Sequence, residues 1–138
     1  MILQFLFGSA IITSTIIIHV GFTAVVEWIL KREHLWPGPR AGLLRFISLL
    51  AAMTLLLLAS ISLCVWLWAL SLIWAGVFQE TEPAVYFSLV TFTTLGFGDI
   101  VLGAEWRIMS GLMAANGLLI FGLTTAVLVD FLARFRRR

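Results

Sequence analysis

Apolar residues occur along this chain in long blocks rather than in the short periods typical of soluble helices and strands. Three blocks hold few charges, and each is longer than the roughly 20 residues that a helix needs to cross the hydrocarbon core of a bilayer. They cover residues 2–30, 46–77 and 108–129, and the last two contain no charge at all. The pattern predicts three transmembrane helices.

A signal peptide is the alternative interpretation of the first block. Signal peptides carry a positively charged segment before an apolar core of about 7 to 15 residues. No lysine or arginine precedes residue 31 in this chain, and the apolar run is much longer. We therefore expect the first block to be a retained helix.

A shorter helix is expected between the second and third blocks. Thr81 or Glu82 is the expected cap, and Pro83 suits the first turn. The residues that follow, 84–92, form a helix of less than about 15 Å, which is too short to cross the bilayer. Backbone that enters a membrane and stops must be surrounded by protein or by a water-filled cavity. The pattern therefore predicts a re-entrant helix.

Composition supports the membrane assignment. Hydrophobic residues make up 62% of the chain and charged residues 12%, whereas a soluble domain averages about half apolar and about a quarter charged. The expected fold class is an all-α membrane protein in a lipid bilayer, and soluble classes are excluded. The single cysteine, Cys64, excludes an intrachain disulfide.

Charges between the blocks differ in sign. Residues 31–45 and 130–138 each hold four basic residues and one acidic residue, whereas residues 78–107 hold four acidic residues and one basic residue. Positive segments stay in the cytoplasm, so we expect a multi-pass protein of the cell membrane with its N-terminus outside and its C-terminus inside. Orientation accounts for the net charge of +2, and no nucleic-acid partner is expected.

The candidate chemistry lies in residues 91–99, which read Thr-Phe-Thr-Thr-Leu-Gly-Phe-Gly-Asp. Threonines followed by two glycines form a backbone whose carbonyl oxygens can replace water around a cation. The run resembles the selectivity filter of the potassium channel family, TVGYG, with leucine for valine and phenylalanine for tyrosine. A glycine-rich extracellular turn is the alternative, and the short helix and flanking spans argue against it.

The resemblance implies a function. K⁺ is the expected permeant ion and partner, conducted passively, with no cofactor and no enzymatic activity. The implied ion-binding residues are Thr94, Leu95, Gly96, Phe97 and Gly98. The carbonyls of the first four surround the ion, and Gly98 lies at the outer mouth. Because one chain supplies one strand of the ring and the family uses four, three further copies of the chain are expected in a homotetramer.

The resemblance covers roughly residues 43–135. We therefore expect an extra N-terminal transmembrane helix with a cytoplasmic loop at residues 1–42, and an ion-channel pore module at residues 43–138. The elements expected in the pore module are an outer helix, a pore helix, the filter and an inner helix, at residues 43–77, 82–92, 93–99 and 106–135.

Six residues are expected to support the filter: Thr91, Thr93, Asp99, Tyr86, Phe87 and Val90. Many family members place a tryptophan at the position of Phe87, hydrogen-bonded to a filter tyrosine. Phe87 and Phe97 are both apolar, so packing is expected instead. Some members place a glutamate at the position of Val90, coupled to the filter acid. Valine cannot do this, and Tyr86 is aligned with an indole that contacts this acid in some members, so the resemblance makes Tyr86 the expected partner of Asp99.

The third block resembles the inner helix of the family. Gly117 lies four residues before Phe121-Gly122-Leu123, at the position of a gating hinge, and close helix packing is the alternative role of such a glycine. Helical spacing places a stripe on one face, expected to line the cavity and gate: Leu118, Phe121, Thr125 and Val129. Asn116, the strongly polar residue of this block, faces either protein or a water-filled cavity. Asp130 and Arg134 suit an ion pair or a charged ring at the inner mouth.

The first block lies outside the resemblance and contains no arginines that would make a voltage sensor. His19 and Glu27 are eight residues apart, so a proton-sensitive pair is one interpretation. Packing against a neighbouring helix, or contact with the membrane interface, is the other.

Three other functions compete with a potassium channel. A weakly selective cation channel would follow from altered packing behind the carbonyls. Potassium transporter subunits carry four degenerate loops in one long chain, usually with one glycine, whereas this chain has one loop with both glycines. A non-conducting membrane assembly protein would have no need of the paired threonines.

Overall fold

The computed structural model of the protein describes residues 2–31 and 43–136. The described part of the chain forms four helices: α1 (Ile2–Lys31), α2 (Leu43–Trp74), α3 (Thr81–Phe92) and α4 (Arg107–Arg136). The predicted cytoplasmic loop at residues 32–42 and the arginines at 137 and 138 lie outside the described residues.

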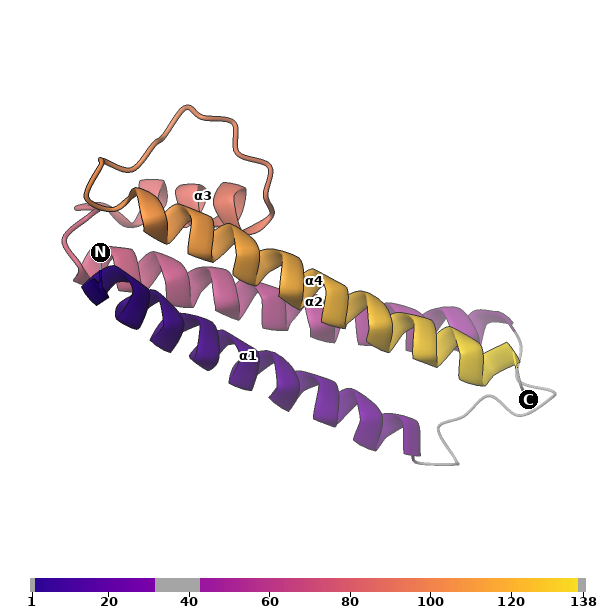
Figure 1. The fold of residues 1–138 in the computed structure, drawn as a ribbon. Helices are drawn as coiled ribbons and strands as arrows, with labels where there is room; N and C mark the ends of the chain where they lie inside the picture. The colour runs from indigo at the N-terminus through magenta and orange to yellow at the C-terminus, as the bar shows by residue number, and fades with distance from the viewer. Residues whose placement is uncertain (1, 32–42, 137–138) are drawn as a thin grey trace.

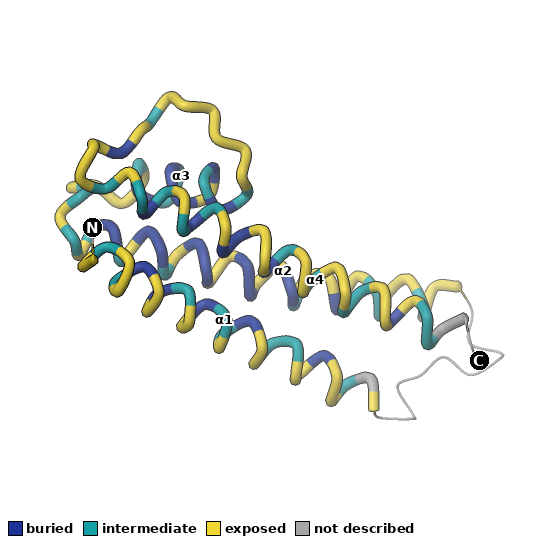
Figure 2. The backbone as a smooth tube through the Cα atoms, in the orientation of Figure 1, coloured by how far each residue is buried: buried dark blue, intermediate teal, exposed yellow. Residues whose placement is uncertain are grey.

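Three of the helices are long and apolar enough to span a membrane. These candidate spans are Ile2–Ile29, Leu43–Trp74 and Arg107–Arg134. They coincide with the three predicted blocks, and the described residues contain no strand, so the expected all-α membrane fold is confirmed. Figure 2 shows exposed residues along the whole length of each long helix, and many of them are large and apolar, as suits contact with lipid.

The three long helices run side by side, and each reverses the direction of the previous one (Figure 1). α1 contacts both α2 and α4, and α3 contacts the same two helices. α3 lies at the end of the bundle where α1 begins, whereas α4 ends at the opposite end. The short helix therefore covers one end of the bundle only.

Two clusters of buried apolar side chains hold the helices together. The larger cluster includes Ile11, Trp68, Phe92 and Met109, and so joins α1, α2, α3 and α4. The smaller cluster contains Val26, Met53, Leu57 and Phe131, and joins α1, α2 and α4. α3 is thus anchored through the larger cluster alone, mainly by residues such as Phe87 and Phe92, which are buried.

A glycine ends α2. The N–H of Gly76 donates to the carbonyl of Ile73 (2.9 Å), and the N–H of Val77 donates to the carbonyl of Leu72 (3.0 Å). This pair of bonds is the Schellman motif, which needs a left-handed residue, and Gly76 has φ 74°. The helix therefore ends at Trp74, whereas the sequence predicted an outer helix to residue 77.

The start of α3 differs from the expected cap. The helix begins at Thr81, and Glu80 is the N-cap, with extended backbone and no side-chain hydrogen bond to the helix. The predicted capping by Thr81 or Glu82 is therefore wrong, because both residues already lie within the first turn. Glu82 still places a negative charge near the positive end of the helix dipole.

Candidate functional site: the loop after α3

α3 ends in the same Schellman motif as α2, but with a threonine in the left-handed position. The N–H of Thr94 donates to the carbonyl of Thr91, and the N–H of Leu95 donates to the carbonyl of Val90, both at 3.0 Å. Thr94 has φ 60°. The loop that follows is therefore fixed to the C-terminal end of the helix through its backbone.

The left-handed conformation of Thr94 is unusual. Among the described residues it is the one non-glycine residue with positive φ, and a β-branched side chain in this region is a genuine outlier. Such strain costs about 1–3 kcal/mol and gathers at functional sites. The sequence carried no signal for it, because glycine is the residue expected at this position of the motif.

Positive φ recurs at every second residue of the loop. Gly96 has φ 55° and Gly98 has φ 80°, so Thr94, Gly96 and Gly98 alternate with residues of negative φ. Glycine adopts these angles without the penalty that a Cβ imposes. The segment is neither helix nor regular strand, and the sign of φ alternates along it.

The loop is open to its surroundings in the single chain. Residues 94–99 are all exposed, and Leu95 and Phe97 expose 59% and 66% of their surface. Two large apolar side chains beside one another at the surface are a feature of contact sites.

The hydrogen bond predicted between Tyr86 and Asp99 is present. The Tyr86 hydroxyl donates to Asp99 Oδ2 at 2.6 Å, and the N–H of Ile100 donates to Oδ1 of the same carboxylate at 3.1 Å. The bond from Tyr86 lowers the pKa of Asp99. The same bond, with burial and the nearby negative charges, raises the pKa of Tyr86. Its stabilising effect therefore persists at neutral pH, and is lost as pH falls through the lowered pKa or rises through the raised one.

Substitution of Asp99 tests this bond directly. Tyr86 is the single tyrosine of the chain, so the ultraviolet absorbance of the phenolate during a pH titration reports this residue alone. We expect Asp99→Asn to lower the pKa of Tyr86 towards its ordinary value, because the carboxylate acceptor is lost. Glu82→Gln is the control and should shift the titration less, since the charge of Glu82 raises the pKa of Tyr86 less than Asp99 does. Identical titrations of the wild type and Asp99→Asn would contradict the assignment.

The other residues predicted to support the filter lie in α3 or directly after it. The carbonyl of Val90 accepts the N–H groups of Leu95 and Gly96, so this position holds the loop through its backbone. The Thr93 hydroxyl donates to the carbonyl of Leu89 at 2.8 Å. Phe87 is buried, and its ring lies 5.6 Å from that of Phe78.

The predicted packing of Phe97 in place of a hydrogen bond is not formed within one chain. Phe87 lies in the larger core cluster, whereas Phe97 remains 66% exposed.

Gly117 lies against the end of α3. A Cβ on Gly117 would overlap the carbonyl oxygen of Phe92 and lie 2.8 Å from its carbonyl carbon, so only hydrogen fits there. A Cβ on Gly111 or Gly122 would meet no atom within 4 Å. Close packing is therefore a role that the structure gives to Gly117, and its function as a hinge stays a prediction.

The loop, the short helix before it and most of the long helix after it fall in one matched segment. A family model described as an ion channel matches residues 52–134. The chain belongs to this ion channel family. The matched range begins within α2, ends within α4 and contains all of α3 and the loop, whereas α1 precedes it. The comparisons with curated proteins and with solved structures gave no match.

The predicted pore-lining stripe of the channel is largely exposed in the single chain. Leu118, Thr125 and Val129 are exposed, and the Thr125 hydroxyl donates to the carbonyl of Phe121 at 2.9 Å. Phe121 is half-buried, with its ring 6.2 Å from that of Phe92. The stripe thus begins beside the end of α3 and continues along an uncovered face of α4.

Asn116 faces protein rather than a cavity. Its side chain is buried, and Nδ2 donates to Oγ1 of Thr15 in α1 at 2.8 Å. Nearer the C-terminus of α4, Arg134 Nε donates to Asp130 Oδ2 at 2.7 Å, which is the ion pair expected from their spacing.

The proposed pair of His19 and Glu27 is not formed. His19 is buried between helices, with Nδ1 2.9 Å from the hydroxyl of Ser60, whereas Glu27 is paired with Lys31 at 3.5 Å. Eight residues of a helix amount to about 80° beyond two full turns, which is enough to place the two side chains on different faces. Packing against a neighbouring helix, the alternative interpretation, describes His19 correctly.

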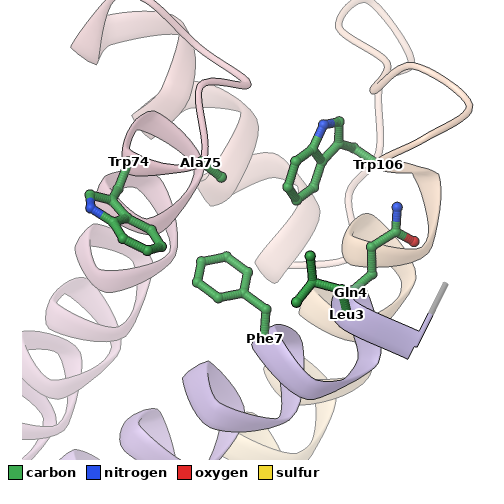
Figure 3. Close-up of a pocket in the computed structure, with 6 residues that line it drawn as sticks. All are labelled: Leu3, Gln4, Phe7, Trp74, Ala75 and Trp106. Carbon is green, nitrogen blue, oxygen red and sulfur yellow. The ribbon is translucent and has the colours of Figure 1, made fainter.

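An apolar pocket of about 300 Å³ lies where α1 begins, α2 ends and α4 is about to start. Its walls, shown in Figure 3, are Leu3, Gln4, Phe7, Trp74, Ala75 and Trp106. The rings of Phe7 and Trp74 stack 5.9 Å apart. None of the wall residues belongs to the loop after α3, so this pocket is separate from the candidate ion site and shows instead how α1 joins that end of the channel.

Proposed function

We propose that the protein is a potassium-selective channel that conducts K⁺ passively through residues 94–98. The observation that carries the proposal is positive φ at Thr94, Gly96 and Gly98. In a regular strand, successive carbonyls point to opposite sides. Reversing the sign of φ at every second residue turns the alternate peptide groups, so that their carbonyls share one side. A row of carbonyl oxygens on one side is what replaces the hydration shell of K⁺ in a filter.

Four copies of the chain complete the proposed filter. One chain contributes one row of carbonyls, and a closed ring requires cyclic symmetry. Leu95, Phe97 and Leu118 support this assembly, because each is a large apolar side chain exposed in the single chain. In a homotetramer Leu95 and Phe97 contact the surrounding helices, and the stripe on α4 faces the central cavity.

Electrostatics favour a cation at this place. The C-terminal end of α3 carries a partial negative charge next to Thr94. The segment 78–107, which contains the loop, holds four acidic residues, and negative charge of this kind raises the local concentration of cations. The balance of basic residues supports an orientation with this end outside the cell and the C-terminus in the cytoplasm.

Reconstitution in planar bilayers with K⁺ on one side and Na⁺ on the other tests the proposal. We expect a reversal potential displaced from zero towards the K⁺ equilibrium potential, because the rigid carbonyl row favours K⁺. A reversal potential near zero would instead support the weakly selective cation channel. The absence of current at every voltage would support the assembly protein.

A further inference from the structure

The first helix, which the family match does not include, is joined to α4 by a buried hydrogen bond. Asn116 Nδ2 donates to Thr15 Oγ1 at 2.8 Å, and both residues are 0% exposed. The Thr15 hydroxyl donates its own proton to the carbonyl of Ile12 at 2.7 Å. The oxygen of Thr15 is thus oriented as an acceptor for Asn116.

Asn116 depends on this one bond. Its Oδ1 has no hydrogen-bond partner among the described residues. Removing the hydroxyl of Thr15 therefore leaves a buried amide without any partner in this part of the chain, which costs more than the bond itself contributes. The position of α4 relative to α1 is accordingly coupled to this contact.

A second polar contact lies further along the same helices. His19 Nδ1 lies 2.9 Å from the hydroxyl of Ser60 in α2, and Nε2 lies 3.4 Å from the hydroxyl of Thr124 in α4. His19 is buried. α1 therefore holds both long helices of the pore module, α2 and α4, through side chains as well as through apolar packing.

The residue after Asn116 connects this contact to the candidate site. Gly117 lies against the Phe92 carbonyl at the end of α3, two residues before Thr94. Adjacent residues of a helix point about 100° apart, so Asn116 reaches α1 while Gly117 meets α3. Rotating or bending α4 at this level disturbs both contacts together.

We propose that Thr15 and Asn116 are positioning residues of the channel, which hold the rotation of α4 against the end of α3 and so bias its opening. The inference rests on the conducting function proposed above. It gives the first helix a role as a fixed brace of the inner helix.

The test uses the full chain reconstituted in bilayers and in lipid nanodiscs. Thr15→Val removes the hydroxyl at nearly constant volume, and we expect the open probability to change by about threefold, and at most about twentyfold, which is the range of one hydrogen bond between membrane helices. The reversal potential should stay unchanged, because residues 94–98 are untouched. In nanodiscs, backbone amides around residues 115–118 should exchange hydrogen faster.

Three further variants act as controls. Thr13→Val removes a hydroxyl that bonds only within α1, to the carbonyl of Ser9, and should behave as the wild type. Thr15→Ser keeps the hydroxyl and should restore the open probability. The double variant of Thr15→Val and Asn116→Leu should change the open probability no more than the more severe of the two single variants, since both substitutions remove the same hydrogen bond.

The outcomes separate this inference from the proposed function. Equal rates of amide hydrogen exchange at residues 115–118 in Thr15→Val and Thr13→Val would overturn the positioning role of Thr15 and Asn116. Faster exchange in Thr15→Val with an unchanged open probability would overturn it as well. A wild-type reversal potential near zero, together with the expected differences in hydrogen exchange and open probability, would contradict the proposed potassium selectivity. It would still support the positioning role of Thr15 and Asn116.

Discussion

Replacing Gly117 by alanine is expected to abolish the current of the channel and to lower the free energy of unfolding by about 3 kcal/mol or more. A methyl group here overlaps the carbonyl oxygen of Phe92. Overpacking a core costs about 1–3 kcal/mol and occasionally more, and backbone cannot rotate away as a side chain does. α4 must therefore move away from the end of α3. Unfolding in detergent and current in planar bilayers measure the two effects.

The same helix supplies the controls for this prediction. Gly111→Ala and Gly122→Ala place a methyl group where no atom lies within 4 Å in the chain, and alanine favours a helix over glycine by about 1 kcal/mol. Both variants are expected to be at least as stable as the wild type. A Gly117→Ala variant that conducts and unfolds like Gly111→Ala would show that the contact with Phe92 is not close in the working channel.

Replacing Gly98 by alanine is expected to remove the proposed preference for K⁺. Gly98 has φ 80°, and a Cβ in the left-handed region costs about 1–2 kcal/mol. A peptide group that turns relieves this strain, and the turn takes its carbonyl out of the proposed row. With K⁺ opposite Na⁺, the reversal potential should move to near zero.

Gly103→Ala is the matched control for the loop. Gly103 is exposed, a methyl group added to it would meet no atom within 4 Å, and it is not among the glycines of positive φ. Its substitution should leave both current and reversal potential unchanged. A Gly98→Ala channel as selective as Gly103→Ala would remove residues 94–98 from the proposed filter.

Much of this architecture follows from the order of residues alone. Uninterrupted apolar runs must be helices in lipid, because no water satisfies their backbone, and this determined the three candidate spans. Residues 81–83 predict the start of a helix, and the apolar run after them is too short to cross the bilayer. These two features determined the short α3. The pair of Tyr86 and Asp99 was predicted from the family resemblance, because Tyr86 is aligned with an indole that contacts this acid in some members, and the hydrogen bond is present.

Other features depended on the tertiary structure. A helical pattern states which residues share a face, but not which neighbouring helix that face meets. The sequence therefore did not decide whether Asn116 faces a cavity or protein. Nor did it decide whether His19 pairs with Glu27 or packs against another helix. Only packing joined Asn116 to α1 and His19 to α2. The left-handed Thr94 likewise arises from the way α3 ends, against the local preference of a β-branched residue.

The sequence by itself thus determined the membrane spans, the short helix and the candidate loop, because each depends on properties of contiguous residues. The tertiary structure alone decided that Gly117 meets the Phe92 carbonyl and that α1 is bonded to the inner helix at the neighbouring residue. These contacts join residues far apart in the chain, and their distances depend on how whole helices pack.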